Sequence, residues 1–214
     1  MILKKSYLIE DNLIQKNTKY FLNEIYQDHD FDFLYIDLEK ILSIEDNASW
    51  NSFTSSIPKE DIYTSELELD KYGIESDKHI SLVYGILPSK YNLKLISQCF
   101  RQNEKSIDIT FKNISFFQNK DRPYDVMKFD IESEGLEYYY TQLLNYLEIT
   151  NESDVRKFGY HPHATIAYLN KNNIYTKYFF EYQLKCLLLE KTFEVHELTF
   201  RDIYGKESII TILV

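Results

Sequence analysis

HISLVY (residues 79–84) and HATIAY (residues 163–168) follow one pattern: histidine, a small or aliphatic residue, a hydroxyl residue, two aliphatic residues and tyrosine. Both segments are short and apolar and contain β-branched residues, which predicts a β-strand for each. Alternate side chains of a strand share a face. His79 and Ser81 should therefore point to one side of the first strand, and His163 and Thr165 to one side of the second. The two segments together predict a site with two imidazoles and two hydroxyls.

The tyrosine that ends each pattern falls at an odd number of residues from its histidine. Strict alternation therefore places Tyr84 and Tyr168 on the opposite face, with the aliphatic residues. We expect these two rings to pack in the core, although their repetition makes them tempting as a sandwich for a nucleobase. Substrate specificity should then come from loops outside the two segments.

Composition limits the function classes that need to be considered. The chain has 214 residues, 44% of them hydrophobic, which fits a single domain with two lobes over residues 1–214. Its net charge of −10 does not fit a protein that coats long nucleic acid, so we expect no long duplex as a partner. Cys99 and Cys186 lie in apolar patterns and should be reduced and buried. With no membrane-spanning stretch and no apolar leader, we expect a cytoplasmic protein without membrane contact.

The remaining pattern is one of short strands, helices and turns. Residues 12–26 and 177–190 have helical spacing, residues 31–38 read as a strand, and residues 43–66 read as a polar loop with short helical pieces. Trp50 and Phe53 should anchor that loop on the body. Further helices should follow Ser89 and Ser133, each a candidate N-cap. The latter helix has the buried stripe Leu136, Tyr140, Leu143 and Leu147.

Two hairpins complete the order of elements. Residues 106–132 form the first, and a strand over residues 193–200 with its return over residues 208–214 forms the second. Beyond residue 78, the order of a histidine strand, a helix and a hairpin then occurs twice. This order predicts an internal duplication of α+β units, with one histidine in each copy.

The two motifs resemble those of the 2H phosphoesterases, which are named for paired segments of the form His, apolar, Ser or Thr, apolar. HISL (79–82) and HATI (163–166) both fit, and the chain is similar to bacterial and phage members in Tyr84-Gly85 and in the Tyr-His-Pro of residues 160–162. The hairpin segment from Ser115 to Asp130 is also similar. The resemblance is clearest over residues 71–214, whereas residues 1–70 form a divergent N-terminal part with an expected insert.

This resemblance implies a fold and a class of reaction. It implies an α+β, bilobal 2H phosphoesterase-like fold, with two pseudo-symmetric antiparallel sheets, flanking helices and a central cleft. It also implies metal-independent cleavage or transfer at phosphodiester bonds, with no cofactor. Substrate classes in the family include RNA ends with 2′,3′-cyclic phosphate, 2′-5′-linked oligoadenylates, ADP-ribose cyclic phosphate and cyclic oligonucleotide signals. Phage members that destroy the signals of CBASS immunity suggest a role in immune evasion, in a host cytoplasm.

The residue types suit that chemistry. Histidine titrates near neutral pH, so one of His79 and His163 can act as general base while the other acts as general acid. Ser81 and Thr165 can donate hydrogen bonds to the non-bridging phosphate oxygens, where negative charge develops. The residues leave open which histidine is the acid, and whether the nucleophile is water or an adjacent ribose 2′-hydroxyl.

Contacts with the substrate are harder to assign. Tyr160 precedes the second motif and could stack on an unpaired base. Arg156 and Lys157 in the same loop, and Arg122 in a hairpin turn, could meet phosphate, although solvated loop cations are the simpler interpretation. We expect the partner to be a small nucleotide or cyclic oligonucleotide, or a short RNA; the sequence predicts no protein partner.

Three alternatives to this interpretation stay open. The first treats the histidines as core residues or as a zinc site formed by His79, His161 and His163, although the hydroxyls have no role in such a site. The second, within enzymes, is RNA-end processing: opening a 2′,3′-cyclic phosphate or joining 2′-5′ ends. The third is a non-catalytic protein that sequesters nucleotides in the same place.

Overall fold

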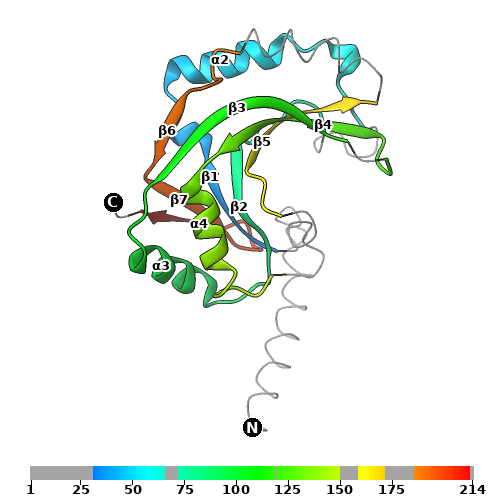
Figure 1. The fold of residues 1–214 in the computed structure, drawn as a ribbon. Helices are drawn as coiled ribbons and strands as arrows, with labels where there is room; N and C mark the ends of the chain where they lie inside the picture. Colours follow the sequence, from blue (N-terminus) through cyan, green and yellow to red (C-terminus); the bar gives the residue numbers. More distant parts are fainter. Residues whose placement is uncertain (1–30, 66–71, 119, 150–158, 172–185, 213–214) are drawn as a thin grey trace.

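The strands form a single antiparallel sheet that curls back on itself. The structure is a computed structural model and describes residues 31–65, 72–118, 120–149, 159–171 and 186–212. Within these ranges eight strands pair in the order β6-β3-β4-β5-β2-β1-β7-β8 (Figure 1). Their bounds are β1 Asp32–Asp37, β2 His79–Ile86, β3 Ile107–Phe117, β4 Tyr124–Glu132, β5 His163–Asn170, β6 Thr192–Val195, β7 Glu197–Arg201 and β8 Glu207–Thr211.

The curl follows from the connection between β6 and β7. The first of these strands is at one edge of the sheet and the second lies next to the other edge, yet only His196 separates them. The sheet must therefore bend until its two ends approach each other. The predicted single strand over residues 193–200 is wrong for this reason, because the chain changes pairing partner at His196, from β3 to β1 and β8.

The sheet consists of two halves that meet where the two motifs lie. Strands β6, β3, β4 and β5 make one half and β2, β1, β7 and β8 the other, joined through the residue pair Ile80 and Ala164. The predicted α+β antiparallel architecture is confirmed, whereas the halves are parts of one continuous sheet and not separate sheets.

Strand register is the same in the two halves. In each, the histidine pairs with an aspartate, the hydroxyl residue pairs with a polar residue two positions earlier, and a one-residue shift follows. The pairs are Asp37–His79, Tyr35–Ser81 and Leu34–Val83 in one half, and Asp130–His163, Lys128–Thr165 and Met127–Ala167 in the other. Equivalent positions such as Tyr35 and Lys128 can therefore be compared directly, as expected for an internal duplication.

The shift is a β-bulge, and it overturns the prediction for the tyrosines. One extra residue in a strand reverses the alternation beyond it. Phe33 contacts both His79 and Tyr84, with ring centroids 5.4 and 5.7 Å apart, so Tyr84 lies on the histidine side of β2. Tyr168 likewise returns to the histidine side of β5, because its partner Val126 alternates with Lys128, the partner of Thr165.

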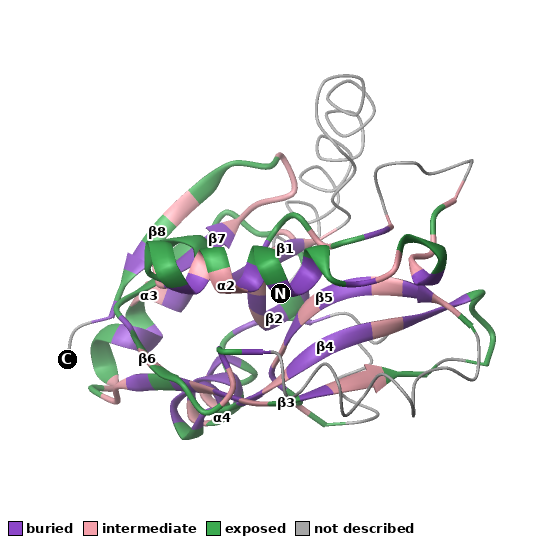
Figure 2. Cartoon of the chain, turned by 90° about the horizontal axis from the view of Figure 1, so that it is seen from above, coloured by how far each residue is buried: buried purple, intermediate pink, exposed green. Residues whose placement is uncertain are grey.

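We call this sheet surface, which carries His79, Ser81, His163 and Thr165, the histidine face. On the opposite face both residues around each bulge are buried, namely Leu82, Val83, Ile166 and Ala167. Figure 2 shows buried and intermediate residues alternating along β5 on either side of its bulge, as expected for a strand with one face in the core, whereas β4 is buried over most of its length.

The segment predicted as a polar loop contains a twelve-residue helix, α2 (Ile44–Ser55). Ser43 caps it by accepting a hydrogen bond from the Asp46 backbone N–H at 3.1 Å. The predicted anchors are confirmed, since Trp50 and Phe53 are buried and both contact the ring of Phe129 on β4. Figure 1 shows α2 lying above β3 and β4. Tertiary packing of these two rings thus outweighs the weak helix propensity of a segment rich in Ser and Asn.

Helices α3 (Asn92–Gln102) and α4 (Glu134–Leu143) lie together away from α2 (Figure 1). The tilted rings of Phe100 and Tyr139 contact each other between them, with ring centroids 4.2 Å apart. Ser133 caps α4 as predicted, but Ser89 does not cap α3. Asn92 fixes the start of α3 instead: it is buried and its amide donates to Asp32 Oδ2 and to the Leu87 carbonyl.

The predictions for the two cysteines and for two further helices can be compared with the described residues. Cys99 and Cys186 are free and buried, as expected. The predicted helix at 12–26 lies outside the described residues, as does most of the one at 177–190. The 3-10 helices η1 (Leu38–Lys40) and η2 (Lys59–Asp61) complete the described elements. Among the described helices, none combines the length and the apolar character needed to cross a bilayer.

Candidate active site

The two predicted motifs lie side by side in the middle of the sheet. Ile80 on β2 pairs with Ala164 on β5, and both are fully buried. Extending this antiparallel register by one residue in each direction places His79 opposite Thr165, and Ser81 opposite His163. Directly opposed side chains have Cβ atoms about 5 Å apart. The four residues are half-buried, so each histidine is accessible and has the hydroxyl of the other motif beside it.

Each imidazole makes the same kind of hydrogen bond, from its Nδ1 to a backbone carbonyl two residues earlier. Nδ1 of His79 lies 2.7 Å from the backbone oxygen of Asp77, and Nδ1 of His163 lies 2.8 Å from that of His161. A carbonyl oxygen only accepts, so Nδ1 carries the proton in each ring. This tautomer leaves Nε2 as the nitrogen that can accept or give a proton during a reaction.

A carboxylate and an aromatic wall surround His79. The Asp77 carboxylate is 3.9 Å from Nδ1, and the rings of Phe33 and Tyr35 stack on each other at 4.8 Å. Both rings meet the imidazole edge-on, at 5.4 and 5.7 Å. One side of His79 is therefore packed by β1, and the negative charge of Asp77 lies beside the ring.

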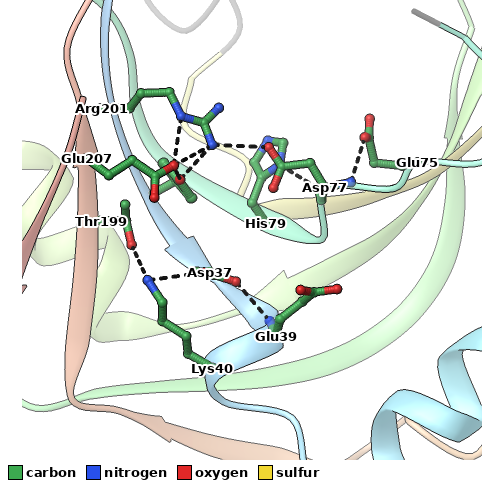
Figure 3. A network of polar contacts seen from close by, with 10 residues as sticks. Asp37, Glu39, Lys40, Glu75, Asp77, His79, Thr199, Arg201 and Glu207 are labelled. Carbon is green, nitrogen blue, oxygen red and sulfur yellow. Dashed lines mark hydrogen bonds and ion pairs between the residues drawn. The ribbon is translucent and has the colours of Figure 1, made fainter. Parts of the chain in front are cut away.

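Arg201 on β7 connects the polar side chains around His79 (Figure 3). Its Nη2 donates to Tyr35 Oη at 2.8 Å, to Glu207 Oε1 at 2.8 Å and to Asp77 Oδ2 at 3.4 Å. Hydrogen bonds from Tyr35 and Arg201 lower the pKa of Glu207. Burial and the hydrogen bond to Glu207 raise the pKa of Tyr35, which keeps it neutral. The guanidinium thus restrains the carboxylate next to His79.

His163 has a different neighbour, the ammonium group of Lys128. Lys128 Nζ contacts the Asp130 carboxylate, donates to Ser115 Oγ at 2.8 Å and lies 4.4 Å from the ring centre of Phe117. The Phe117 ring meets His163 edge-on at 4.8 Å. Burial alone would raise the pKa of Asp130, but hydrogen bonds from Lys128, Asn113 and Ser115 lower it on balance.

These surroundings change the titration of His163. Burial lowers its pKa, and the positive charges of Lys128 and His79 act in the same direction. The hydrogen bond to the His161 carbonyl and the charge of Asp130 oppose this shift without reversing it. The electrostatic effect of His79 on His163 also reflects how close the two rings lie. The neutral form of His163, with its Nε2 lone pair free, is therefore favoured.

Sequence reasoning missed several of these residues. Asp77, Lys128, Asp130 and Arg201 were not predicted, although a usable signal existed for two of them. Lys128 and Asp130, followed by Glu132, are charged residues at alternating positions of β4, which marks a polar face. Arg201 gave no such signal, because its link to Asp77 spans 124 positions of the sequence.

The predicted substrate contacts have different outcomes. The Tyr160 ring stacks on Tyr140, with centroids 4.4 Å apart, and its hydroxyl donates to the Ser81 carbonyl at 3.1 Å. This position favours packing over base stacking and ties the approach to β5 onto β2. Arg122 donates to Tyr124 Oη at 2.8 Å, at the β3–β4 hairpin. Arg156 and Lys157 lie outside the described residues.

The surroundings of the histidines bear on the alternative of a zinc site. Among the described residues, which include His79, His161 and His163, no group of three or more His, Cys, Asp or Glu side chains is arranged to hold a metal ion. The Nδ1 atoms of His79 and His163 are hydrogen-bonded to backbone carbonyls.

Comparisons with solved structures show where this fold occurs. Usb1 of Kluyveromyces marxianus aligns with a TM-score of 0.52 at 11% identity, over 85% of this chain and 98% of that one. The same protein with uridine monophosphate gives 0.53 at 11% identity and the same coverage. Escherichia coli LigT with 3′-AMP gives 0.47 at 13% identity, over 87% and 96%. At these identities the likeness to Usb1 shows the fold alone.

Sequence comparison identifies the family. No curated protein sequence matches the chain. The family model described as the 2′-5′ RNA ligase superfamily matches residues 67–207, which is more than half of the chain and includes both motifs. This chain therefore belongs to the 2′-5′ RNA ligase superfamily, the 2H phosphoesterases.

Proposed function

We propose that the protein is a metal-independent phosphodiesterase that cleaves a small nucleotide by two-histidine acid–base catalysis. Membership of the superfamily indicates a phosphodiesterase-type enzyme in general. The single observation that carries the proposal is the adjacency of the two motifs through Ile80 and Ala164, with both Nδ1 atoms fixed by backbone carbonyls. Such an arrangement offers two Nε2 atoms and two hydroxyls to one phosphate.

The proposed reaction needs three contributions. One histidine takes the proton of the attacking hydroxyl, from water or a ribose 2′-hydroxyl, while the other gives a proton to the leaving oxygen. Each such contribution is typically worth about 10²–10⁴-fold in rate. Ser81 and Thr165 donate to the non-bridging oxygens, whose negative charge increases in the transition state.

A nucleotide is a better substrate for this face than a simple phosphate ester. Tyr84 and Phe117 lie on the histidine face with 57% and 40% of their surfaces exposed. Exposed aromatic rings next to a phosphate site can stack on unpaired bases, at about 1–3 kcal/mol per base. The Usb1 structure that holds uridine monophosphate has the same fold. The net charge of −10 disfavours long nucleic acid.

Within this class we propose a cyclic oligonucleotide or a 2′-5′-linked signal as the substrate, and evasion of nucleotide-based host immunity as the role. Two aromatic side chains, one near each histidine, suit a substrate with a base on each side of the cleaved phosphate. RNA-end processing is the second candidate, favoured by the description of the matching family as 2′-5′ RNA ligases. A nucleotide-sequestering protein is the alternative without catalysis.

One experiment separates these functions. The purified protein is incubated in EDTA with cyclic di- and trinucleotides, 2′-5′ oligoadenylate and RNA ending in 2′,3′-cyclic phosphate, and the products are resolved by chromatography. We expect turnover of one substrate class, lost in both His79→Ala and His163→Ala. His196→Ala is the matched control, because His196 is exposed, lies outside the histidine face and pairs with Glu194.

Each result has a defined meaning. Cleavage confined to the RNA ends would favour the second candidate, and tight binding without products would favour sequestration. Activity that is unchanged in either histidine variant would contradict the two-histidine mechanism. Turnover abolished by EDTA and restored by a divalent cation would contradict metal independence.

A further inference from the structure

We propose that charge breaks the symmetry of the two motifs: Lys128 makes His163 the general base, and Asp77, held by Arg201, makes His79 the general acid. This inference rests on the proposed two-histidine function and assigns the roles that the motifs alone leave interchangeable. Lys128, Asp77 and Arg201 are positioning residues here, since they act on the histidines and not on the substrate.

Equivalent positions of the two halves carry different chemistry. Tyr35 pairs with Ser81 and Lys128 pairs with Thr165, so these two side chains occupy the same place in each half. Tyr35 is neutral, whereas Lys128 carries a positive charge. The backbone arrangement is therefore symmetric, and the charge beside each histidine is not.

On the His163 side, the ammonium group is fixed in a poorly hydrated place. The Lys128 side chain is only 8% exposed and is held by Asp130 and Ser115 from one side and the Phe117 ring from another. The charged groups that face His163 are Lys128 and Asp130 on β4 and His79 on β2, while β3 contributes the uncharged Phe117. Burial is the largest cause that lowers the pKa of His163, and the charges of Lys128 and His79 lower it further and outweigh that of Asp130. A neutral imidazole with a free Nε2 lone pair is a base.

On the His79 side, the nearest charge is negative. Asp77 provides both the backbone oxygen bonded to Nδ1 and a carboxylate 3.9 Å away. Arg201 restrains that carboxylate and is itself neutralised by Glu207 (Figure 3). Asp37 on β1 is the register partner of His79, and His163 on β5 faces His79 from the other side. The Asp77 carboxylate therefore lies where it compensates positive charge on the His79 ring, and Nε2 is the ring nitrogen left to give a proton to the leaving oxygen.

The proton balance of the step is complete. His163 Nε2 takes the proton of the attacking hydroxyl as its oxygen forms the new bond to phosphorus. The bond between phosphorus and the leaving oxygen breaks with its electron pair, and that oxygen receives the Nε2 proton of His79. His163 ends protonated and His79 neutral, and proton exchange with solvent restores both.

The inference predicts a titration change that does not depend on turnover. Imidazole NMR signals are followed against pH, and the His163 signal is identified by its loss in His163→Ala. Lys128→Met should raise the pKa of His163, because it removes a nearby cation and leaves Asp130. Lys128→Arg keeps the charge and should leave the titration in place, and Asp130→Asn should move it in the opposite direction. Lys128→Gln is a second neutral variant should the methionine impair folding.

Rate profiles then test the assignment of roles. A base must be neutral to act, so Lys128→Met should move the acid limb of the pH–rate profile to higher pH. Since one pH unit corresponds to a tenfold change in the active fraction, we expect about a three- to tenfold loss at the acid end and little change at the alkaline end. Asp77→Asn should move the alkaline limb to lower pH, because the acid loses its carboxylate.

Two results overturn the inference while leaving the proposed function intact: a His163 titration that is the same in Lys128→Met and wild type, or an alkaline limb that moves in Lys128→Met instead of the acid limb. Loss of the proposed function looks different, since wild-type protein would then show no turnover of any substrate.

Discussion

The register through Ile80 and Ala164 places Ser81 and Thr165 each opposite the histidine of the other strand, so the two motifs depend on each other at the level of single side chains. We expect Ser81→Ala and Thr165→Val to lower kcat by about 10²–10³-fold with a smaller effect on KM, because a lost donor to developing charge acts mainly in the transition state. Steady-state kinetics on the substrate that the proposed panel identifies provides the measurement. Thr165→Ser keeps the hydroxyl and should retain most activity.

The two Thr165 variants also define the result that would contradict a role of the hydroxyl. If Thr165→Val and Thr165→Ser had equal kcat values near that of wild type, the hydroxyl would have no part in the reaction. Thr165 would then be a packing residue on β5.

The sequence largely predicted which residues of the two motifs share a face, but not the face on which the two tyrosines lie. The repeated spacing of histidine and hydroxyl placed four side chains correctly on one face. It failed for Tyr84 and Tyr168, since a bulge after each hydroxyl residue reverses the alternation. The adjacent aliphatic pairs Leu82-Val83 and Ile166-Ala167 are a signal in the sequence, because a bulge places both members of such a pair on the buried face.

At the scale of elements, strands were predicted better than helices. The strands at β2, β4 and β5 follow directly from apolar periodicity, whereas the segment of α2 was predicted as a loop with short helical pieces because its sequence is polar. Its stability depends on Trp50 and Phe53 packing on a strand more than 75 residues away in the sequence. Contacts at such separation are invisible to local propensity.

Helix α4 offers a prediction about packing. A Cβ atom on Gly135 would lie 2.5 Å from the backbone oxygen of Ser106 and 2.9 Å from Ile107 Cα. Alanine is ordinarily favoured over glycine inside a helix by about 1 kcal/mol. Here the clash with backbone should outweigh that gain, and we expect Gly135→Ala to destabilise the fold by about 1–3 kcal/mol.

Urea denaturation followed by circular dichroism measures this effect. Glu137→Ala, at an exposed position of the same helix, is the control and should change the free energy of unfolding little. A Gly135→Ala protein as stable as wild type would show that α4 does not pack this closely on the start of β3.

For the whole molecule, a repeated arrangement around the two histidines was predicted, and the way its halves differ was not. The order of elements predicted two copies, and the matching register of β1 with β2 and of β4 with β5 supports this. The helix expected in the second copy lies mostly outside the described residues. The strand break at His196 allows β6 to pair with β3 at one end of the sheet and β7 to pair with β1 near the other end. This break depends on long-range pairing. So does the difference in charge around the histidines, because Arg201 and Asp77 come from distant segments.

The central claim is that the two copies form one active site, and the rate of the His79→Ala/His163→Ala double variant tests it most directly. Residues that act together in one step are strongly non-additive. We therefore predict that each single variant loses about 10²-fold or more, and that the double variant loses little beyond the poorer single variant. Single-turnover rates for all four proteins, at one pH and with saturating enzyme, are compared. A single variant that keeps wild-type activity, or a double variant whose loss equals the product of the two single losses, would contradict the account.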